Sequence, residues 1–134
     1  FPRQYTWFAG MLLKLVEQMG KGGLDDTLAE LGRGVGASMK PQLPGDPGSP
    51  AQIAEIAKAM TEIGYDAAVQ TEGGESFIAA HNCVFHRLAS DHPEVCGFDV
   101  AMLSASSGCE VEHRSCMIRG GSACRFHFQA GKKI

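Results

Sequence analysis

All five cysteines of this 134-residue chain lie between residues 83 and 124. Twelve residues separate Cys83 from Cys96 and Cys96 from Cys109, and fourteen separate Cys109 from Cys124, with Cys116 inside the last gap. In a reducing compartment, an odd number of cysteines indicates metal binding, redox chemistry or apolar packing rather than structural disulfides. Thiolate is the form that binds a metal ion or cluster. The sequence therefore predicts a metal site in this region.

Two of these cysteines fall where a helix is expected to begin. Cys83 follows an asparagine that suits the cap of a short helix, and Cys96 lies in the first turn of a longer one. Unpaired N–H groups at a helix N-terminus favour negative charge and lower the pKa of a nearby thiol. Cys124 alternates with Phe126 and Phe128, so we expect its sulfur on the apolar face of the last strand.

The fourth ligand depends on the length of the turn in the last hairpin. A turn of even length at its two glycines pairs Met117 with Cys124 and sends Cys116 to the opposite face of the sheet. Cys109, expected in the loop after the longer helix, is then the better candidate. An odd-length loop reverses that choice in favour of Cys116. A histidine such as His86 is a further alternative.

The elements that position these residues follow from hydrophobic periodicity. Residues 5–19 carry apolar side chains at helical spacing, and glycines separate them from a second amphipathic helix that ends near Met39. A connector rich in proline and glycine covers residues 41–50. A third helix is then expected, with Ser49 as its cap and Pro50 at its first position.

Beyond the third helix the apolar period changes to two. Strands are expected at residues 67–71 and 76–82, and again at 110–119 and 123–129, each pair joined by a glycine-containing turn. The sequence therefore predicts an α+β domain, in which N-terminal helices pack on a small antiparallel sheet made of two hairpins, with two helices between the hairpins. His127 alternates away from the aromatic face of its strand, so we expect it on the surface.

Length and charge limit the role of the chain. The size fits one domain, with helical residues 1–40 as a candidate dimer interface and residues 51–134 as the cysteine-bearing core. The net charge of −3 argues against a nucleic-acid surface. Because the sequence has no run of 18 apolar residues and no signal-peptide cleavage site, we expect a cytoplasmic protein without a membrane span.

The cysteine-bearing region resembles a known family in its spacing and its phrases. The phrases are NCVF at 82–85 with LA at 88–89, HPEVC at 92–96, GGSACRF at 120–126, and the opening FPRQY at 1–5. They look like the C-terminal half of SufR-type regulators, which are bacterial helix-turn-helix repressors that sense iron–sulfur clusters and control their assembly. The resemblance spans most of the chain, and the cysteine spacing is its specific part. The closing hairpin is also similar to vinyl-reductase-type sensor domains.

The SufR-type resemblance implies a cofactor and a set of ligands. Cys83, Cys96 and Cys124 match the ligand positions of the family, and Cys109 matches the fourth, although the family's middle gap is one residue longer. A [4Fe-4S] cluster is expected rather than [2Fe-2S]. The chain would then be no enzyme. It would be the sensing and dimerising part of a homodimeric regulator that contacts DNA only through a fused domain absent from this sequence.

Three alternative functions, each with a different chemistry, remain open. Zinc could be held by three cysteines and His86 or His81, although the close Cys-x₂-Cys pairs of common zinc modules are absent. An apolar ligand could be lined by phenylalanines such as Phe85, Phe98 and Phe126, which serve equally well as core.

A nucleophilic thiol is the third alternative. It would pair Cys83 with His86, or Cys116 with His113. A base of this kind needs a third group to orient it, and the sequence offers no obvious one.

Overall fold

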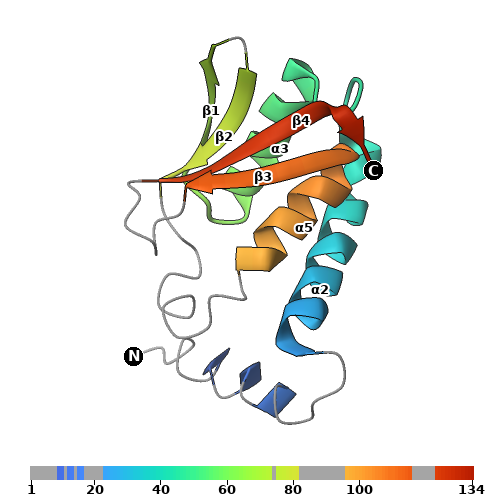
Figure 1. Cartoon of the computed structure of the whole chain (residues 1–134), viewed down its shortest axis with the longest axis vertical. Coiled ribbons are helices and arrows are strands. Elements are labelled where there is room, and N and C mark those ends of the chain that lie inside the picture. Colours follow the sequence, from blue (N-terminus) through green and yellow to red (C-terminus); the bar gives the residue numbers. More distant parts are fainter. Residues whose placement is uncertain are drawn as a thin grey trace.

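A four-stranded antiparallel sheet and three helices form the described part of the protein (Figure 1). The computed structural model describes residues 9–10, 12–13, 15–16, 23–73, 75–81, 96–115 and 123–134. The helices are α2 (Gly23–Met39), α3 (Pro50–Glu62) and α5 (Cys96–Ser107), with a 3₁₀ turn η1 (Lys40–Gln42). The strands are β1 (Ala67–Glu72), β2 (Glu75–Ala80), β3 (Cys109–Ser115) and β4 (Cys124–Lys133). The predicted α+β class is confirmed.

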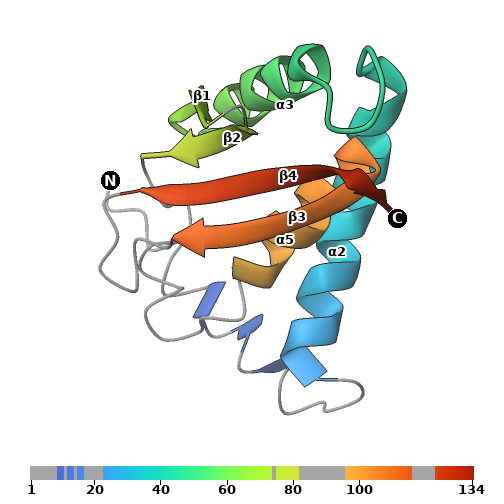
Figure 2. The same cartoon turned by 45° about the horizontal axis from the view of Figure 1, so that its top comes forward.

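The sheet joins the two hairpins through their second strands, in the order β1-β2-β4-β3. β2 pairs with β4 only from Phe77↔His127 to Ala80↔Cys124. Beyond Phe77 the two strands diverge (Figure 2), and a hollow of about 530 Å³ opens between the start of β2 and the second half of β4. The strands are therefore in register at one end of the sheet, where Cys124 lies, and splayed at the other.

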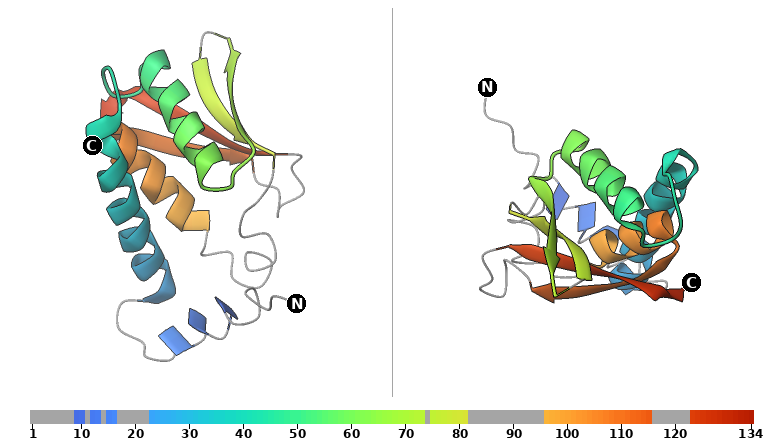
Figure 3. Two further views of the ribbon diagram at one scale, coloured as in Figure 1. Left: turned by 180° about the vertical axis from the view of Figure 1, so that it is seen from behind. Right: turned by 90° about the horizontal axis from the view of Figure 1, so that it is seen from above.

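α3 and α5 cover one face of the sheet, and α2 runs alongside α5 (Figure 3). The core between these layers contains apolar side chains from α3, β2, α5 and β4: Ile53, Ile56, Met60, Ile78, Met102, Leu103 and Phe126. Burial of such large side chains contributes about 1.5–3 kcal/mol each, which makes this core the main source of stability. The predicted packing of N-terminal helices on the sheet is confirmed.

Local signals place α3 where the sequence predicts it. The hydroxyl of Ser49 accepts a hydrogen bond from the backbone N–H of Gln52 at 3.2 Å, and Pro50 occupies the first helical position. The side-chain oxygen of Gln52 accepts from the N–H of Gly48 at 2.7 Å, so the cap extends one residue further back than a capping box does. Gly64, at φ +111°, follows the helix and lets the chain turn away from it.

α2 and α5 pack with almost no side chain between them. A Cβ built on Gly32 would overlap the carbonyl oxygen of Phe98, and one built on Gly36 would overlap that of Met102. The same Cβ on Gly36 would lie 2.9 Å from the Cβ of Ala105. Only glycine allows the two backbones to approach so closely, which explains why α2 carries glycines despite their low helix propensity.

Some predicted boundaries shift or fall outside the described residues. The predicted first helix, at residues 5–19, is described only at positions 9–10, 12–13 and 15–16, which are helical. The predicted short helix after residue 82 lies outside the described residues. β4 reaches Lys133, four residues beyond the predicted end of its strand.

Candidate functional site

Each of the three described cysteines lies at the edge of an element. Cys109 begins β3, Cys124 begins β4, and Cys96 is the first described residue of α5. Cys109 and Cys124 are 0% and 6% exposed, and Cys96 is partly buried against the same apolar core. The structure corrects the prediction that Cys109 lies in a loop, because the strand starts at this residue. Cys83 and Cys116, and the alternative ligand His86, lie outside the described residues.

A buried contact joins α5 to the end of the sheet. The hydroxyl of Tyr65 donates a hydrogen bond to Oδ1 of Asp99, three residues after Cys96 on α5. Tyr65 and Asp99 are 5% and 7% exposed. Because residues three apart lie on one face of a helix, Asp99 and Cys96 face the same region of the core.

Backbone pairing connects the Tyr65–Asp99 contact to Cys124. Asp66, next to Tyr65, accepts a hydrogen bond at 2.9 Å from the N–H of His81. Ala80, the residue before His81, pairs with Cys124 across β2 and β4. The beginning of α5 and the in-register end of the sheet therefore lie on the same side of the molecule, which Figures 1, 2 and 3 show from different directions. The structure brings Cys96 and Cys124 to one end of the fold.

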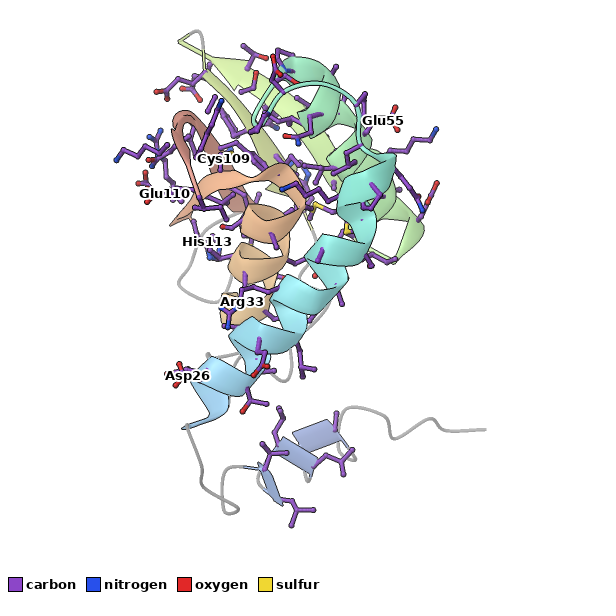
Figure 4. The ribbon with its side chains drawn as sticks, turned by 90° about the vertical axis from the view of Figure 1, so that its right-hand side faces the viewer. Asp26, Arg33, Glu55, Cys109, Glu110 and His113 are labelled. Carbon is purple, nitrogen blue, oxygen red and sulfur yellow. The ribbon has the colours of Figure 1, made fainter. Side chains whose placement is uncertain are left out.

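Cys109 lies at the other end. α5 separates it from Cys96, and a helix of 12 residues is about 18 Å long. On the sheet it pairs with Lys133 and lies six residues before Ser115, whose partner Arg125 follows Cys124, so about 20 Å of strand separates the two cysteines. Figure 4 shows Cys109 near the sheet end of α5. A metal–sulfur bond is about 2.3 Å long, so Cys109 cannot share one centre with Cys96 or Cys124 in this fold.

The last hairpin is described on both sides of its turn, and residues 116–122, which include the turn, lie outside the described part of the chain. His113 pairs with Phe126 and Ser115 pairs with Arg125, with a bulge at Arg114 between them. An even turn that pairs Met117 with Cys124 would place residue 116, not Ser115, opposite Arg125. Because the turn and Cys116 lie outside the described residues, the choice between Cys109 and Cys116 by turn length stays a prediction.

Cys109 has a structural environment of its own. Its N–H donates to the hydroxyl of Ser107 at 3.3 Å, and its sulfur lies 3.3 Å from the same oxygen. The backbone carbonyl of Ser107 accepts from the side chain of Gln52, 3.0 Å away on α3. Cys109 is therefore part of the buried junction between α5, β3 and the start of α3.

Asp99 is a buried ionisable group whose environment shifts its pKa. Burial raises the pKa of its carboxyl from 3.8 to about 6, because the charged form loses its hydration, and the hydrogen bond from Tyr65 opposes that rise. Sequence reasoning missed both residues. The signal that could have found them is an aspartate three residues after a candidate ligand, on the apolar face of a helix.

The phenylalanines proposed as a ligand pocket belong to the core where they are described. Phe126 is buried and stacks on the ring of His113, with ring centroids 4.6 Å apart, and Phe98 packs against the core from α5. Phe85 lies outside the described residues. His113 is thus engaged with Phe126 rather than standing in an open site as a base.

His127 corrects another prediction, that it lies on the surface. It is 7% exposed, and its Nε2 lies 3.1 Å from the carboxylate of Glu75 on β2. Arg114 lies 3.3 Å from the same carboxylate. The sheet face opposite the helices therefore carries a polar network next to the hollow between β2 and β4.

Comparisons of the chain with protein-family models, with curated proteins and with solved structures found no match. Among the described residues, no three histidine, cysteine or acidic side chains are grouped closely enough to hold a metal ion. The helices within those ranges include none with the length and apolar character needed to span a bilayer.

Proposed function

We propose that this chain is the sensor part of a bacterial transcription regulator and holds an iron–sulfur cluster at the end of the sheet where Cys96 and Cys124 lie. The observation that carries the proposal is the Tyr65–Asp99 contact, because it places the beginning of α5 beside the strand that Cys124 begins. The resemblance to SufR-type regulators gives the class of cofactor. When bound, the cluster would be held by iron–thiolate bonds. Their formation would depend on the supply of iron and sulfide and on redox state.

The cysteines at this end of the fold suit an iron–sulfur cluster. Cys96 and Cys124 are soft thiol ligands with low exposure, which suits a cluster that must be kept from water. Cys83 is three residues beyond Ala80, the partner of Cys124, so the covalent chain limits its α-carbon to about 11 Å from that of Ala80. Cys116 directly follows Ser115, whose partner is the neighbour of Cys124. Cys109 is not retained as a ligand, because it lies at the opposite end.

The chain also has a route by which this end could act on the rest of the regulator. α5 carries Cys96, and its carbonyl groups at Phe98 and Met102 lie directly against Gly32 and Gly36 of α2. Without side chains to absorb a displacement, a shift of α5 moves α2. α2 follows the N-terminal segment, which in SufR-type proteins leads to the DNA-binding domain.

Dimerisation forms part of the same proposal. Apolar side chains are exposed on the described N-terminal residues Leu12 and Leu15 and on Leu31 and Val35 of α2. Their burial against a second copy would connect α2 of one protomer to that of its partner. We propose a cytoplasmic homodimer in which DNA is contacted only by the fused domain. Sedimentation at micromolar concentration tests this, and a monomer would contradict it.

Anaerobic reconstitution with iron and sulfide tests the cluster. The wild-type chain should gain visible charge-transfer absorption together with iron and sulfide, whereas Cys96→Ser and Cys124→Ser should not retain them. Cys109→Ser is the matched control, because it removes a buried sulfur at the other end of α5 and should keep the cluster. A wild-type chain that takes up zinc but no iron and sulfide would replace this proposal with the zinc alternative.

A further inference from the structure

The hollow between β2 and β4 has the size of a small-molecule site. Its volume is about 530 Å³, and the described residues that line it come from α3, from the loop before α3 and from β2, β3 and β4. It lies beyond Phe77↔His127, the pair at which the β2–β4 ladder ends (Figure 2). Cavities of this volume accommodate compact ligands. An extended peptide would run into the paired part of the sheet, so the hollow suits a small molecule better than an added strand.

The apolar part of the lining is held in place by close packing. Ile53 of α3 and Phe128 of β4 line the hollow, and both belong to the buried core. The loop before α3 lies directly on β4, because a Cβ built on Gly48 would lie 2.8 Å from the Cβ of Ala130. The side-chain oxygen of Gln52 accepts a hydrogen bond from the N–H of Gly48, which fixes this loop. The hollow is therefore preformed, and its apolar residues can bury the hydrocarbon part of a ligand.

A buried histidine in the lining has hydrogen-bonding capacity that the described residues do not use. His127 lines the hollow and is 7% exposed, and its Nε2 lies 3.1 Å from Oε2 of Glu75. Its Nδ1 is also buried and has no hydrogen-bond partner within the described part of the chain. Buried polar atoms are nearly always paired, because leaving one unpaired destabilises the fold. A polar group of a bound ligand at this imidazole would supply the missing partner.

The charges around the hollow leave a positive group without a counter-ion. Oε2 of Glu75 is shared between His127 and Arg114, and Arg114 also lies 3.4 Å from the carboxylate of Glu112. Lys132 lines the hollow as well, and it makes no ion pair with any residue that the structure describes. The acidic group of the lining is thus already engaged by two basic side chains, whereas the ammonium of Lys132 is not. An anionic ligand therefore fits the hollow better than a cationic one.

We propose that this hollow binds a small amphipathic carboxylate, whose hydrocarbon part lies on Ile53 and Phe128. Its carboxylate lies between Lys132 and His127. The ammonium of Lys132 supplies the counter-charge. The imidazolium form of His127 has two N–H groups, so it can donate to Glu75 through Nε2 and to the ligand through Nδ1. The site lies at the splayed end of the sheet and does not depend on the proposed cluster.

Nuclear magnetic resonance titration of the ¹⁵N-labelled chain tests the site and the class of ligand. Hexanoate, hexanamide and hexylamine have hydrocarbon chains of similar length and differ in the charge of the head group. Hexanoate should shift the backbone amide signals of residues 75–76 and 127–132 with a Kd of about 1 mM, because so small a ligand makes few contacts. Hexanamide and hexylamine should bind about tenfold more weakly. Tighter binding of hexylamine, or shifts confined to other elements, would overturn the proposal.

Two adjacent lysines of β4 provide a matched pair of variants. Lys132 lines the hollow, whereas Lys133 is exposed and pairs with Cys109 on β3. Lys132→Gln should weaken the binding of hexanoate about fivefold, because it removes the counter-charge and keeps a side chain of similar length. Lys133→Gln should leave the Kd unchanged. Equal effects of the two substitutions would contradict the placement of the carboxylate beside Lys132.

Ser76→Leu tests the cavity itself. Ser76 lines the hollow from β2, so a larger side chain there should fill it and prevent hexanoate from binding. Thr71→Leu is the control, because Thr71 is the partner of Ser76 on β1 and lies outside the lining. Circular dichroism shows whether Ser76→Leu folds, and Lys132→Gln decides the test if it does not. A wild-type chain that takes up iron and sulfide but binds no hexanoate would overturn this inference alone, and the reverse result would overturn only the proposed function.

Discussion

The Tyr65 hydroxyl and the Asp99 carboxylate are hydrogen-bonded across 34 residues of sequence, and both are buried. Tyr65 lies two residues before β1, and Asp99 is in the first described turn of α5. The contact ties the helix that carries Cys96 to the strands that position Cys124. It fixes the orientation of α5 more specifically than apolar packing does, because a buried polar pair has few arrangements in which both groups are satisfied.

Tyr65→Phe should destabilise the apoprotein at neutral pH by about 2 kcal/mol, because it leaves a buried carboxylate without its donor. Urea unfolding of the metal-free chain measures this change. The same substitution in an Asp99→Asn background should cost less, since a neutral amide is less costly to leave unpaired. Equal losses in the two backgrounds would show that the hydroxyl does not act through Asp99.

Asp99→Asn should change how stability depends on pH. Burial raises the pKa of Asp99 from 3.8 to about 6, so the folded chain binds this proton more tightly than the unfolded chain does. The contribution of Asp99 to the free energy of unfolding is therefore fully present below about pH 4. It falls as the pH rises through about 6 and is constant above that.

The size of this effect follows from the shift of about two pKa units, which corresponds to about 3 kcal/mol. Asparagine has no such proton. The difference in unfolding free energy between Asp99→Asn and wild type should therefore move in favour of the variant by up to that amount between about pH 4 and pH 7. Denaturant titrations at several pH values measure this difference in unfolding free energy. A difference that does not change with pH would contradict the raised pKa of Asp99.

Features set by adjacent residues could be predicted from the sequence. Ser49 and Pro50 mark the start of α3 through a cap and a fixed φ, and Gly64 marks its end, because each of these effects acts within one helical turn. The first hairpin follows from two short β-forming runs around a glycine turn, and its register pairs Glu72 with Glu75. The α+β class then follows from the order of the elements.

Features set by distant pairing could not be predicted in the same way. Cys109 was expected in a loop, and its place at the start of β3 depends on how β3 registers with β4 and on the bulge at Arg114. His127 alternates to the polar face as predicted, but it is buried, because β2 brings Glu75 beside it. The sequence could single out Asp99 by its position on α5, but no local signal predicts its pairing with Tyr65, since the two residues meet only after the sheet and α5 are assembled.

Substitution of alanine for Gly36 should separate α2 from α5. The added methyl group would overlap the carbonyl oxygen of Met102 and lie 2.9 Å from the Cβ of Ala105, so the backbones must move apart at a cost of about 3 kcal/mol. Gly34→Ala is the control in the same helix, because no atom lies within 4 Å of its added Cβ. It should stabilise the chain by about 0.5–1 kcal/mol through helix propensity. Thermal and urea unfolding compare the two, and equal effects would contradict the close contact.

Cys109→Ala should cost more stability than Cys96→Ala, whereas only Cys96→Ala should abolish cluster retention. Cys109 is fully buried and touches the hydroxyl of Ser107, so its loss should cost the apoprotein about 1 kcal/mol and leave the iron content unchanged. Cys96 is only partly buried, so its loss should cost the apoprotein less and abolish iron retention. Urea unfolding of the metal-free variants and iron analysis after reconstitution measure the two effects. If Cys109→Ala loses iron while its apoprotein stays as stable as wild type, the placement of Cys109 away from the site is wrong.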